Sequence, residues 1–424
     1  MSRPALAVAA AAALAYLPSL AGVFQFDDYN VIVHYDTVHS WQALLERWGG
    51  GVRPLLKASY TLNWTLGGGF HLLNIAFHAM NAALLFFIGD SLFRDRRAAL
   101  IAALLFALHP AATEAVTYVS GRSSSLMALF YLGALLAYLR GAHWSVSSLL
   151  FLCALATRET AVTLPAALLL CELCRSQWPG WREVLRRQWA HWTILLAGAA
   201  LVLLNPRYFD LVAYGFGERS LADNLLTQVG GVSYLILRLV TLHGYNIDPA
   251  LPALTEWTPG LVFQAVLLLS LFTVGVVNFR ARPWVAFGVL WFFLQLAPTN
   301  SIVPRLDVAN DRQLYLASWG LFLAAGIQLR NLGRTFWGFV LLLFATTSVA
   351  RQVDYWSEIS LWESSVALAP WNARGHNNLG YAYQLAGRTE DARREYRAAL
   401  TFEPRHAKAR LNLEFLPPET VKKR

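Results

Sequence analysis

The sequence predicts an all-α protein, a polytopic bundle of membrane-crossing helices followed by a short soluble helical tail. Of its 424 residues, 56% are hydrophobic and only 14% are charged, whereas soluble globular proteins carry about 25% charged residues. Apolar runs recur from the N-terminus to about residue 350, many of them near the roughly 20 residues that a membrane crossing needs. After residue 351 the charges become dense and the apolar positions follow helical spacing. This composition argues against a soluble multidomain enzyme.

We expect about eleven crossings, some of them short because helices inside a bundle can be broken or shielded by their neighbours. They are expected at 4–24, 70–92, 98–119, 124–140, 145–157, 160–174, 191–205, 259–279, 283–298, 313–330 and 335–350. Residues 221–246 are apolar in their second half but contain Arg238 and a pair of glycines. We therefore expect that segment to dip into the membrane without crossing it, and the odd number of crossings to place the two termini on opposite sides.

The basic residues predict the orientation and argue against a nucleic-acid partner. The formal net charge is +9, but the arginines lie in short clusters between apolar runs. Because cytoplasmic loops carry an excess of Lys and Arg, the N-terminus is predicted to be cytoplasmic and the tail to lie outside. The Arg-, Ala-, Leu- and Gly-rich composition favours a bacterium, and hence an inner-membrane protein with a periplasmic tail. Residues 5–17 could instead form the apolar part of a cleaved signal peptide, but we favour a retained first helix.

The tail predicts two domains, a membrane domain at 1–350 and a helical repeat at 351–424. One window fits the 34-residue tetratricopeptide repeat, whose small and aromatic positions let two antiparallel helices interlock. The matching positions are Leu379, Gly380, Tyr383, Ala392, Tyr396, Ala399 and Pro404. A half-repeat flanks it on each side, so we expect the tail to pack on the outer face of the membrane domain. It could serve as a platform for a partner peptide or as a rim that stabilises the last crossing.

Ionisable residues near or inside crossings usually mark a functional site or its support. Asp27 and Asp28 directly follow the first crossing, and adjacent residues point in different directions. His71, Asn74, His78 and Asn81 lie on one face of a predicted helix, a pattern that on its own favours helix packing over ligand binding. Two histidines on that face could bind a metal ion, but no third ligand has suitable spacing, so we predict no metal site.

Other polar residues are expected at the same outer boundary. A phosphate oxygen fits the fork of an arginine, and a carboxylate can take a proton from an attacking hydroxyl. A sugar carried on a polyprenyl phosphate would present both needs there, with its lipid tail among the helices. The residues are Arg53, Lys57, His109, Glu114, Arg122, Arg158, Glu159, Asp311, Arg312 and Tyr315.

These segments together resemble the transmembrane and tetratricopeptide-repeat O-mannosyltransferases, which belong to the GT-C superfamily of polyprenyl-phosphate-dependent glycosyltransferases. The order of the segments is preserved over nearly the whole chain. Some positions differ from the family pattern: Ser123-Ser124-Ser125 replaces a small and then an acidic residue, Arg158 precedes the glutamate where the family favours lysine, and Asp311 replaces glutamate. The repeat tail is also much shorter than in eukaryotic members.

The resemblance implies a GT-C-like bundle and an inverting transfer of a hexose, expected to be mannose, from a polyprenyl-phosphate carrier to Ser/Thr hydroxyls of exported proteins. Asp27 or Asp28 would be the general base on the acceptor. Arg312, Arg122, Arg158 and Arg53 would bind the donor phosphate. The substrate or its surroundings would be supported by Glu114, His109, His78, His71, Asn74, Glu159, Asp311 and Tyr315. No cofactor and no metal is expected, since the lipid-linked sugar is a substrate; the partners are that lipid, membrane lipids and an acceptor protein that could dock on the tail.

Two other classes of protein are alternatives to a glycosyltransferase. A transporter or flippase of lipid-linked or small anionic solutes would explain the crossings and the charges within them. It would not explain the tail or the Asp27-Asp28 loop, and the sequence shows no inverted repeat of the kind typical of transporters. A scaffold that only displays the tail would leave the charges within the crossings without a role.

Overall fold

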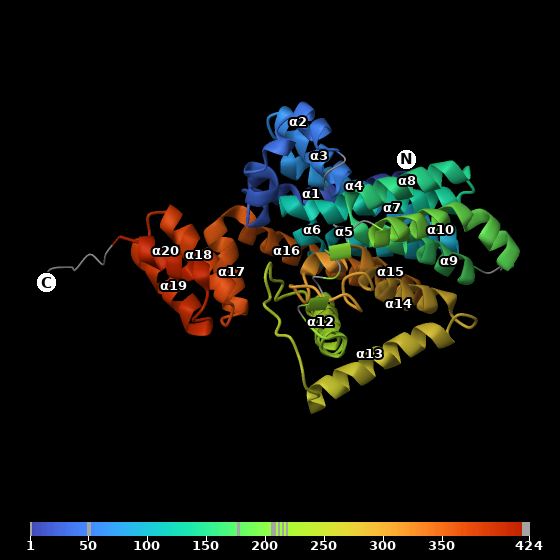
Figure 1. Ribbon diagram of the computed structural model, residues 1–424. Helices are drawn as coiled ribbons and strands as arrows, with labels where there is room; N and C mark the ends of the chain where they lie inside the picture. Colours follow the sequence, from blue (N-terminus) through green and yellow to red (C-terminus); the bar gives the residue numbers. More distant parts are fainter. Residues whose placement is uncertain are drawn as a thin grey trace.

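The computed structural model describes residues 2–48, 52–175, 179–204, 209–210, 213, 216–217 and 219–417. Throughout these residues the regular structure is helical, without strands, as the sequence predicts (Figure 1). The long helices of the membrane part are α1 (Arg3–Ala15), α4 (Phe70–Phe93), α5 (Arg96–Leu108), α7 (Arg122–Leu139), α8 (Trp144–Thr157), α9 (Leu164–Leu173), α10 (Trp181–Leu204), α12 (Leu221–Thr241), α13 (Pro259–Val277), α14 (Pro283–Leu296), α15 (Leu314–Leu329) and α16 (Arg334–Val353). Short helices join them: α2 (Trp41–Glu46), α3 (Pro54–Thr65) and α6 (Thr113–Val116).

Several helices are suited to crossing a membrane, which makes the chain an integral membrane protein. Within the described residues, five helical segments are long and apolar enough: Arg3–Ala21, Phe70–Phe93, Val119–Leu139, Pro259–Val277 and Arg334–Trp356. A sixth would be the pair Arg96–Leu108 and Pro110–Val116, which is bent by 57°. The other expected crossings fall on shorter or less apolar helices, so the number eleven stays a prediction.

Two expected segments differ in detail from the structure. The segment predicted at 98–119 is broken at Pro110, whose ring cannot continue the hydrogen-bond pattern of the preceding helix. The segment predicted at 191–205 belongs to α10, which already begins at Trp181, and its last predicted residue lies outside the described residues. Residues 221–246, expected to dip into the membrane, contain the single helix α12.

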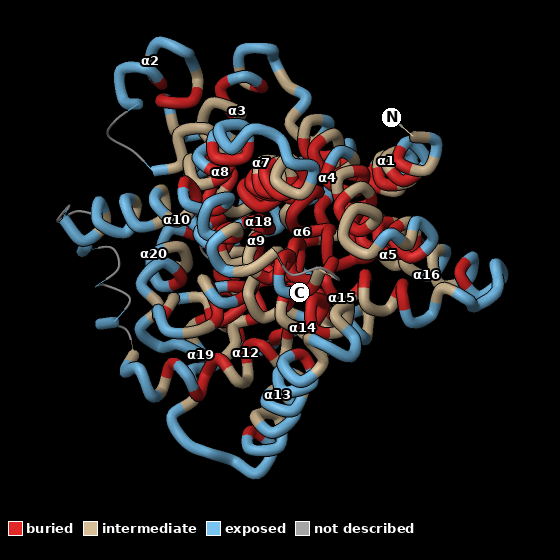
Figure 2. The backbone as a smooth tube through the Cα atoms, turned by 90° about the vertical axis from the view of Figure 1, so that its right-hand side faces the viewer, coloured by how far each residue is buried: buried red, intermediate tan, exposed pale blue. Residues whose placement is uncertain are grey.

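The centre of the bundle is formed by α1, α4, α5, α7, α14 and α15, which pack on one another. Figure 2 shows buried residues concentrated there, whereas α13 is exposed along most of its length. Alanines such as Ala98, Ala99 and Ala102 on α5 are fully buried and let neighbouring helices approach closely. The exposed apolar surface of α13 is typical of a helix that faces lipid.

The tail consists of α17 (Glu358–Leu368), α18 (Ala373–Leu385), α19 (Thr389–Phe402) and α20 (Ala407–Phe415), gathered at one end of the molecule (Figure 1). α18 and α19 pack closely because Gly380 has no side chain: a Cβ atom there would lie 2.7 Å from the ring of Tyr396. The tail also contacts the membrane part. The Gln25 side chain donates to the Tyr355 carbonyl, and Trp371 Nε1 donates to the Ala250 carbonyl.

Candidate active site

A cavity of about 280 Å³ lies where the loop after α1 meets the first turns of α3 and α7 and the loops before α9 and α15. We call it the cationic cavity, because five of its lining side chains are basic. It is lined by Asp27, Asn30, Val31, Tyr35, Val52, Arg53, Leu56, Lys57, Tyr60, Ser120, Ser123, Arg158, Arg305 and Arg312. A smaller cavity of about 30 Å³ shares Arg158 and Arg312 with it and lies beside α7, α14 and α15. Segments from the two ends of the membrane part thus meet at one site.

Asp27 is the carboxylate of the cationic cavity. Its backbone N–H donates to Tyr118 Oη at 2.8 Å, which fixes the turn of the loop. The preceding residue, Phe26, has a φ of +44°, a left-handed conformation that is strained for a non-glycine residue and that clusters at functional sites. Burial raises the pKa of Asp27, while the charge of Arg312 lowers it. The result is a half-buried carboxylate with a raised affinity for a proton, as a general base requires.

Asp28 is not among the residues that line the cavity. Its side chain is fully buried, and its oxygens accept hydrogen bonds from the Ser120 N–H at 2.7 Å, from the Ser120 hydroxyl and from the Gln25 N–H at 3.0 Å. Burial raises its pKa to about 7, against the effect of these donors. Asp28 therefore joins the loop after α1 to the segment before α7, and the two adjacent carboxylates have different surroundings.

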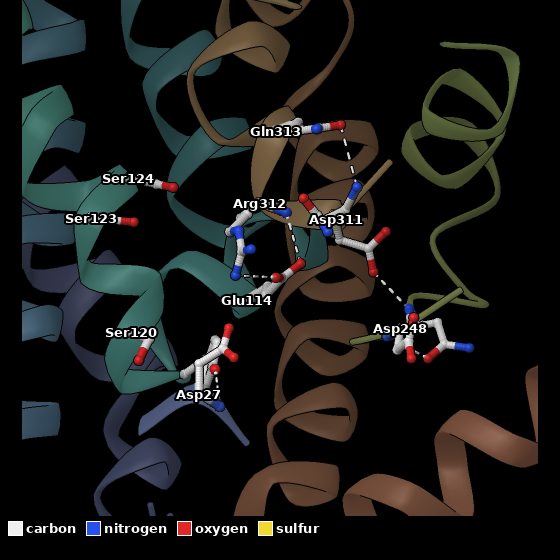
Figure 3. Close-up of polar contacts among 12 residues, drawn as sticks. Asp27, Glu114, Ser120, Ser123, Ser124, Asp248, Asp311, Arg312 and Gln313 are labelled. Atoms are coloured by element: carbon white, nitrogen blue, oxygen red, sulfur yellow. Dashed lines mark hydrogen bonds and ion pairs between the residues drawn. The ribbon is translucent and has the colours of Figure 1, made fainter. Parts of the chain in front are cut away.

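Arg312 is held by Glu114. Glu114 Oε2 accepts from the Arg312 backbone N–H at 2.8 Å, and Glu114 Oε1 lies 3.2 Å from Arg312 Nη1. Figure 3 shows Arg312 against Glu114, with Asp27 nearby. α6 and α7 can approach here because Gly121 lacks a side chain: a Cβ atom would lie 2.0 Å from the Glu114 carbonyl oxygen. Glu114 thus orients one cation of the cavity.

Two other cations in the cavity have unused hydrogen-bond donors. Arg158 is 5% exposed, and its guanidinium donates to the hydroxyls of Ser123 and Ser124. Its Nε and Arg305 Nη1 are buried without a hydrogen-bond partner. Within the part of the chain that the structure describes, no carboxylate forms an ion pair with Arg158 or Arg305. A buried cation without a partner is unfavourable, so these groups favour an anionic ligand.

Arg53 and Glu159 form a second pair at the rim of the cavity. Arg53 Nε and Nη2 donate to the two Glu159 oxygens at 3.0 and 2.6 Å. Arg53 has a φ of +57° immediately before Pro54, which begins α3. This pair links the start of α3 to the break between α8 and α9 and leaves Arg53 in the cavity wall.

Arg122 corrects a prediction. It does not line the cationic cavity; it is fully buried, and its N–H groups donate to Asn74 Oδ1 at 2.7 Å and to the carbonyls of Ser59 and Phe70 at 2.9 and 2.8 Å. Neutral oxygens therefore accept from the Arg122 N–H groups that the sequence predicts to bind phosphate. Arg122 and Asn74 connect α3, α4 and α7.

The three predicted histidines also lie outside the cavity lining. His78 contacts Tyr315 Oη at 3.0 Å and the Ala107 carbonyl at 3.1 Å. His109 accepts from the Ala111 N–H and contacts the Leu239 carbonyl. The His71 ring lies against Gly22. All three lie at contacts between segments, which for His71 and His78 is the packing role that their shared helix face favours.

Asp311 and Tyr315 support the site from α15 and the turn before it. Asp311 Oδ2 accepts from the Asn246 N–H at 2.7 Å, which ties the turn that carries Arg312 to the loop after α12. Tyr315 lines the smaller cavity, and its hydroxyl accepts from the Asn81 side chain. The sequence does not predict Arg305, which lies outside the apolar runs, or Tyr118, an uncharged aromatic residue at the end of the apolar run 98–119.

Comparison with known proteins shows similarity to mannosyltransferases. A family model described as mannosyltransferase (PIG-V) matches residues 52–198, which include Arg53, Glu114 and Arg158. The chain is 25% identical to protein O-mannosyl-transferase F38B6.6 of Caenorhabditis elegans, over 92% of this chain and 61% of that protein. It is 28% identical to protein O-mannosyl-transferase TMTC1 of Homo sapiens, over 98% of this chain and 57% of that protein. The chain is thus similar to these transferases over most of its length.

The similarity to protein O-mannosyl-transferases extends beyond the segment that the family model matches. A third relative, protein O-mannosyl-transferase Tmtc1 of Drosophila melanogaster, is 35% identical over a shorter stretch, 40% of this chain and 22% of that protein. The chain spans about three fifths of the length of the nematode and human relatives. Since those two alignments cover more than nine tenths of the chain, the similarity includes both the membrane part and the tail.

Proposed function

We propose that the chain is an inverting membrane glycosyltransferase that moves a hexose, mannose, from a polyprenyl-phosphate carrier to a Ser or Thr hydroxyl of an exported protein. The observation that carries the proposal is the cationic cavity, in which one carboxylate faces several basic side chains. In the reaction the acceptor oxygen bonds to the anomeric carbon while the bond from that carbon to the phosphate oxygen breaks. The phosphate keeps the bonding electrons, and Asp27 takes the hydroxyl proton.

The basic side chains suit the leaving phosphate. Arg158 and Arg305 each have a buried N–H group without a partner, and Arg312 is oriented by Glu114 from behind. Fixed cations that face developing negative charge lower the barrier to reaction, because they need no reorganisation when the charge forms. Phosphate leaves readily in this setting without a general acid. The positive charge of the cavity thus favours a phosphate-linked donor.

Asp27 suits the acceptor. Among the described residues that line the cationic cavity, it supplies the only carboxylate, whereas Asp28 is occupied by hydrogen bonds to Ser120 and Gln25. A single carboxylate matches one direct displacement, in which the base activates the acceptor and the sugar configuration inverts. We therefore assign the base to Asp27, with Asp28 as the residue that holds its loop.

The purified protein in lipid vesicles should transfer radiolabelled mannose from polyprenyl-phosphate mannose to a Ser/Thr-containing peptide. The label should resist release by mild acid, as a glycosidic bond does, and the same peptide with Ala at every Ser and Thr should remain unlabelled. Transfer should persist in EDTA, since we propose that the cations of the cavity take the place of a divalent metal ion. An unlabelled peptide with wild-type protein would contradict the proposed reaction.

We further propose that the protein lies in a bacterial inner membrane with its N-terminus in the cytoplasm and the cavity and tail in the periplasm. The two exposed alanines Ala386, between α18 and α19, and Ala142, between α7 and α8, offer matched positions for a test. In a background in which Ala replaces Cys153, Cys171 and Cys174, Ala386→Cys should react in intact spheroplasts with a membrane-impermeant thiol reagent. Ala142→Cys should react only after lysis, and the opposite pattern would reverse the orientation.

A further inference from the structure

Arg374 on α18 connects the tail to the loops of the candidate site. Arg374 Nε and Nη2 donate to the two oxygens of Asp248 at 2.7 and 2.6 Å. Arg374 Nη2 also donates to Asp307 Oδ1 at 2.8 Å. Asp248 is 3% exposed and follows α12, while Asp307 lies in the loop before α15. One guanidinium thus joins three separate segments.

The same side chain contacts the loop that carries Asp27. The Arg374 guanidinium carbon lies 5.9 Å from the ring centroid of Phe26. On another side, the Phe26 ring meets Trp362 of α17 edge to face, with centroids 5.3 Å apart. Phe26 is the strained residue directly before Asp27, and a strained conformation persists only where its surroundings hold it. Two tail side chains supply part of that support.

Asp307 connects Arg374 to a second segment of the cavity lining. It lies two residues after Arg305, which lines the cationic cavity. By fixing Asp307, Arg374 limits where the loop can place Arg305. The contacts of Arg374 therefore extend both to the segment of the proposed base and to a segment that carries a phosphate-binding candidate.

We propose that Arg374 is a positioning residue, through which the tail holds Asp27 and Arg305 at the distance that the reaction requires. This inference rests on the proposed function, and it gives the tail a role in the active site itself that is separate from docking an acceptor. Arg374 does not line the cavity, so it acts through its neighbours.

The charge of Arg374 should also be visible in the pH dependence. Burial raises the pKa of Asp27, whereas Arg312 and then Arg374 lower it. The negative groups near Asp27 are Asp307 and Asp28. Tyr118 Oη accepts from the Asp27 backbone N–H, and its hydrogen bond to the Asp27 side chain also lowers the pKa of Asp27. The remaining cations are those of the cavity lining. Removing Arg374 takes away a positive charge, so Asp27 should lose its proton only at higher pH.

The variant Arg374→Gln should lower kcat for mannose transfer about tenfold or more, since small misplacement of reacting groups slows reactions strongly. KM for the lipid-linked donor should change little, and the rising part of the pH–rate profile should move to higher pH. Arg374→Lys keeps the charge and should recover part of kcat and the wild-type profile. Arg394→Gln is the matched control, because Arg394 forms comparable ion pairs with Asp391 and Glu395 inside the tail. It should behave like the wild type.

A second variant separates positioning from stability. Arg374→Gln leaves Asp248 buried without its partner, which destabilises the tail. Arg374→Gln with Asp248→Asn removes that buried charge and leaves only Asp307, whose side chain is 35% exposed, without its ion pair to Arg374. If this folded double variant still has low kcat and a shifted pH profile, positioning is supported. Wild-type kcat and an unchanged profile in the double variant would overturn it.

A readout without activity distinguishes this inference from the proposed function. Hydrogen–deuterium exchange over residues 23–30 should be faster in the double variant than in the wild type, and unchanged in Arg394→Gln. Unchanged exchange at 23–30 in the double variant would overturn the inference even if the wild type transfers mannose. A wild-type protein without transferase activity, but with the expected change in exchange, would contradict the proposed reaction and leave the tail contact supported.

Discussion

Replacing Asp27 with asparagine should lower mannose transfer by about 10²–10⁴-fold, the usual contribution of a general base. The asparagine side chain has nearly the same shape, and the hydrogen bond from the Asp27 backbone N–H to Tyr118 Oη does not involve the carboxylate. The loop should therefore keep its conformation, and the loss should appear in kcat. The measurement is the initial rate of transfer by purified protein in vesicles, with binding of the lipid-linked donor measured separately.

Asp28→Asn is the matched control, since it makes the same chemical change at the adjacent residue. The amide oxygen introduced at this position could still accept from Ser120, but the new NH₂ group would face either Gln25 or Ser120 as a second donor. We expect a lower yield of folded protein, with transfer per folded molecule much closer to the wild type than in Asp27→Asn. Equal losses in the two variants, or full activity of Asp27→Asn, would contradict the assignment of the base.

The sequence identifies this pair of carboxylates but cannot distinguish their roles. Adjacency predicts only that the two side chains point in different directions. The difference arises because Ser120, 92 residues further along, presents both its N–H and its hydroxyl to Asp28. Nothing in the periodicity around either segment shows that they meet. Residue type and spacing therefore predict the candidates, and a tertiary contact separates them.

The arginines show the same limit. Arg122 and Arg158 both stand at the ends of apolar runs beside small polar residues, and the sequence predicts that both bind phosphate. The structure surrounds Arg122 with the Asn74 side chain and two carbonyls, while Arg158 keeps a buried Nε without a partner. A predicted helix face does show that Asn74 points inward, but its partner cannot be found without the packing of α4 on α7. Arg305, in an irregular loop, has no local signal at all.

The sequence predicts more of the fold than of the site. Lipid requires long apolar helices, so composition and apolar runs directly predict most of the elements. Pro110 also marks where one helix breaks. Which loops converge cannot be predicted in this way, since that depends on the order in which α1, α4, α5, α7 and α15 pack around one another. The cationic cavity exists only through that arrangement.

Arg158→Gln should lower transfer strongly while leaving the protein at least as stable as the wild type. Removing one fixed donor from a site of developing negative charge lowers kcat by about 10²–10³-fold. Stability should respond in the opposite sense, because Arg158 is a buried cation that, within the described ranges, forms hydrogen bonds to the neutral hydroxyls of Ser123 and Ser124. The glutamine amide of this variant can donate to the same hydroxyls without burying a charge. Thermal unfolding in detergent, together with the transfer rate, measures both effects.

The comparison with Arg312→Gln makes this prediction sharper. Arg312 neutralises Glu114, whose side chain is only 2% exposed, so its loss leaves a buried carboxylate without its partner, which is strongly destabilising. We thus expect both variants to lose transfer but only Arg312→Gln to lose stability. If Arg158→Gln also melts at a markedly lower temperature, Arg158 has a structural role like that of Arg122. If it melts at or above the wild-type temperature and has lost transfer, the unpaired guanidinium is retained for an anion that the substrate brings.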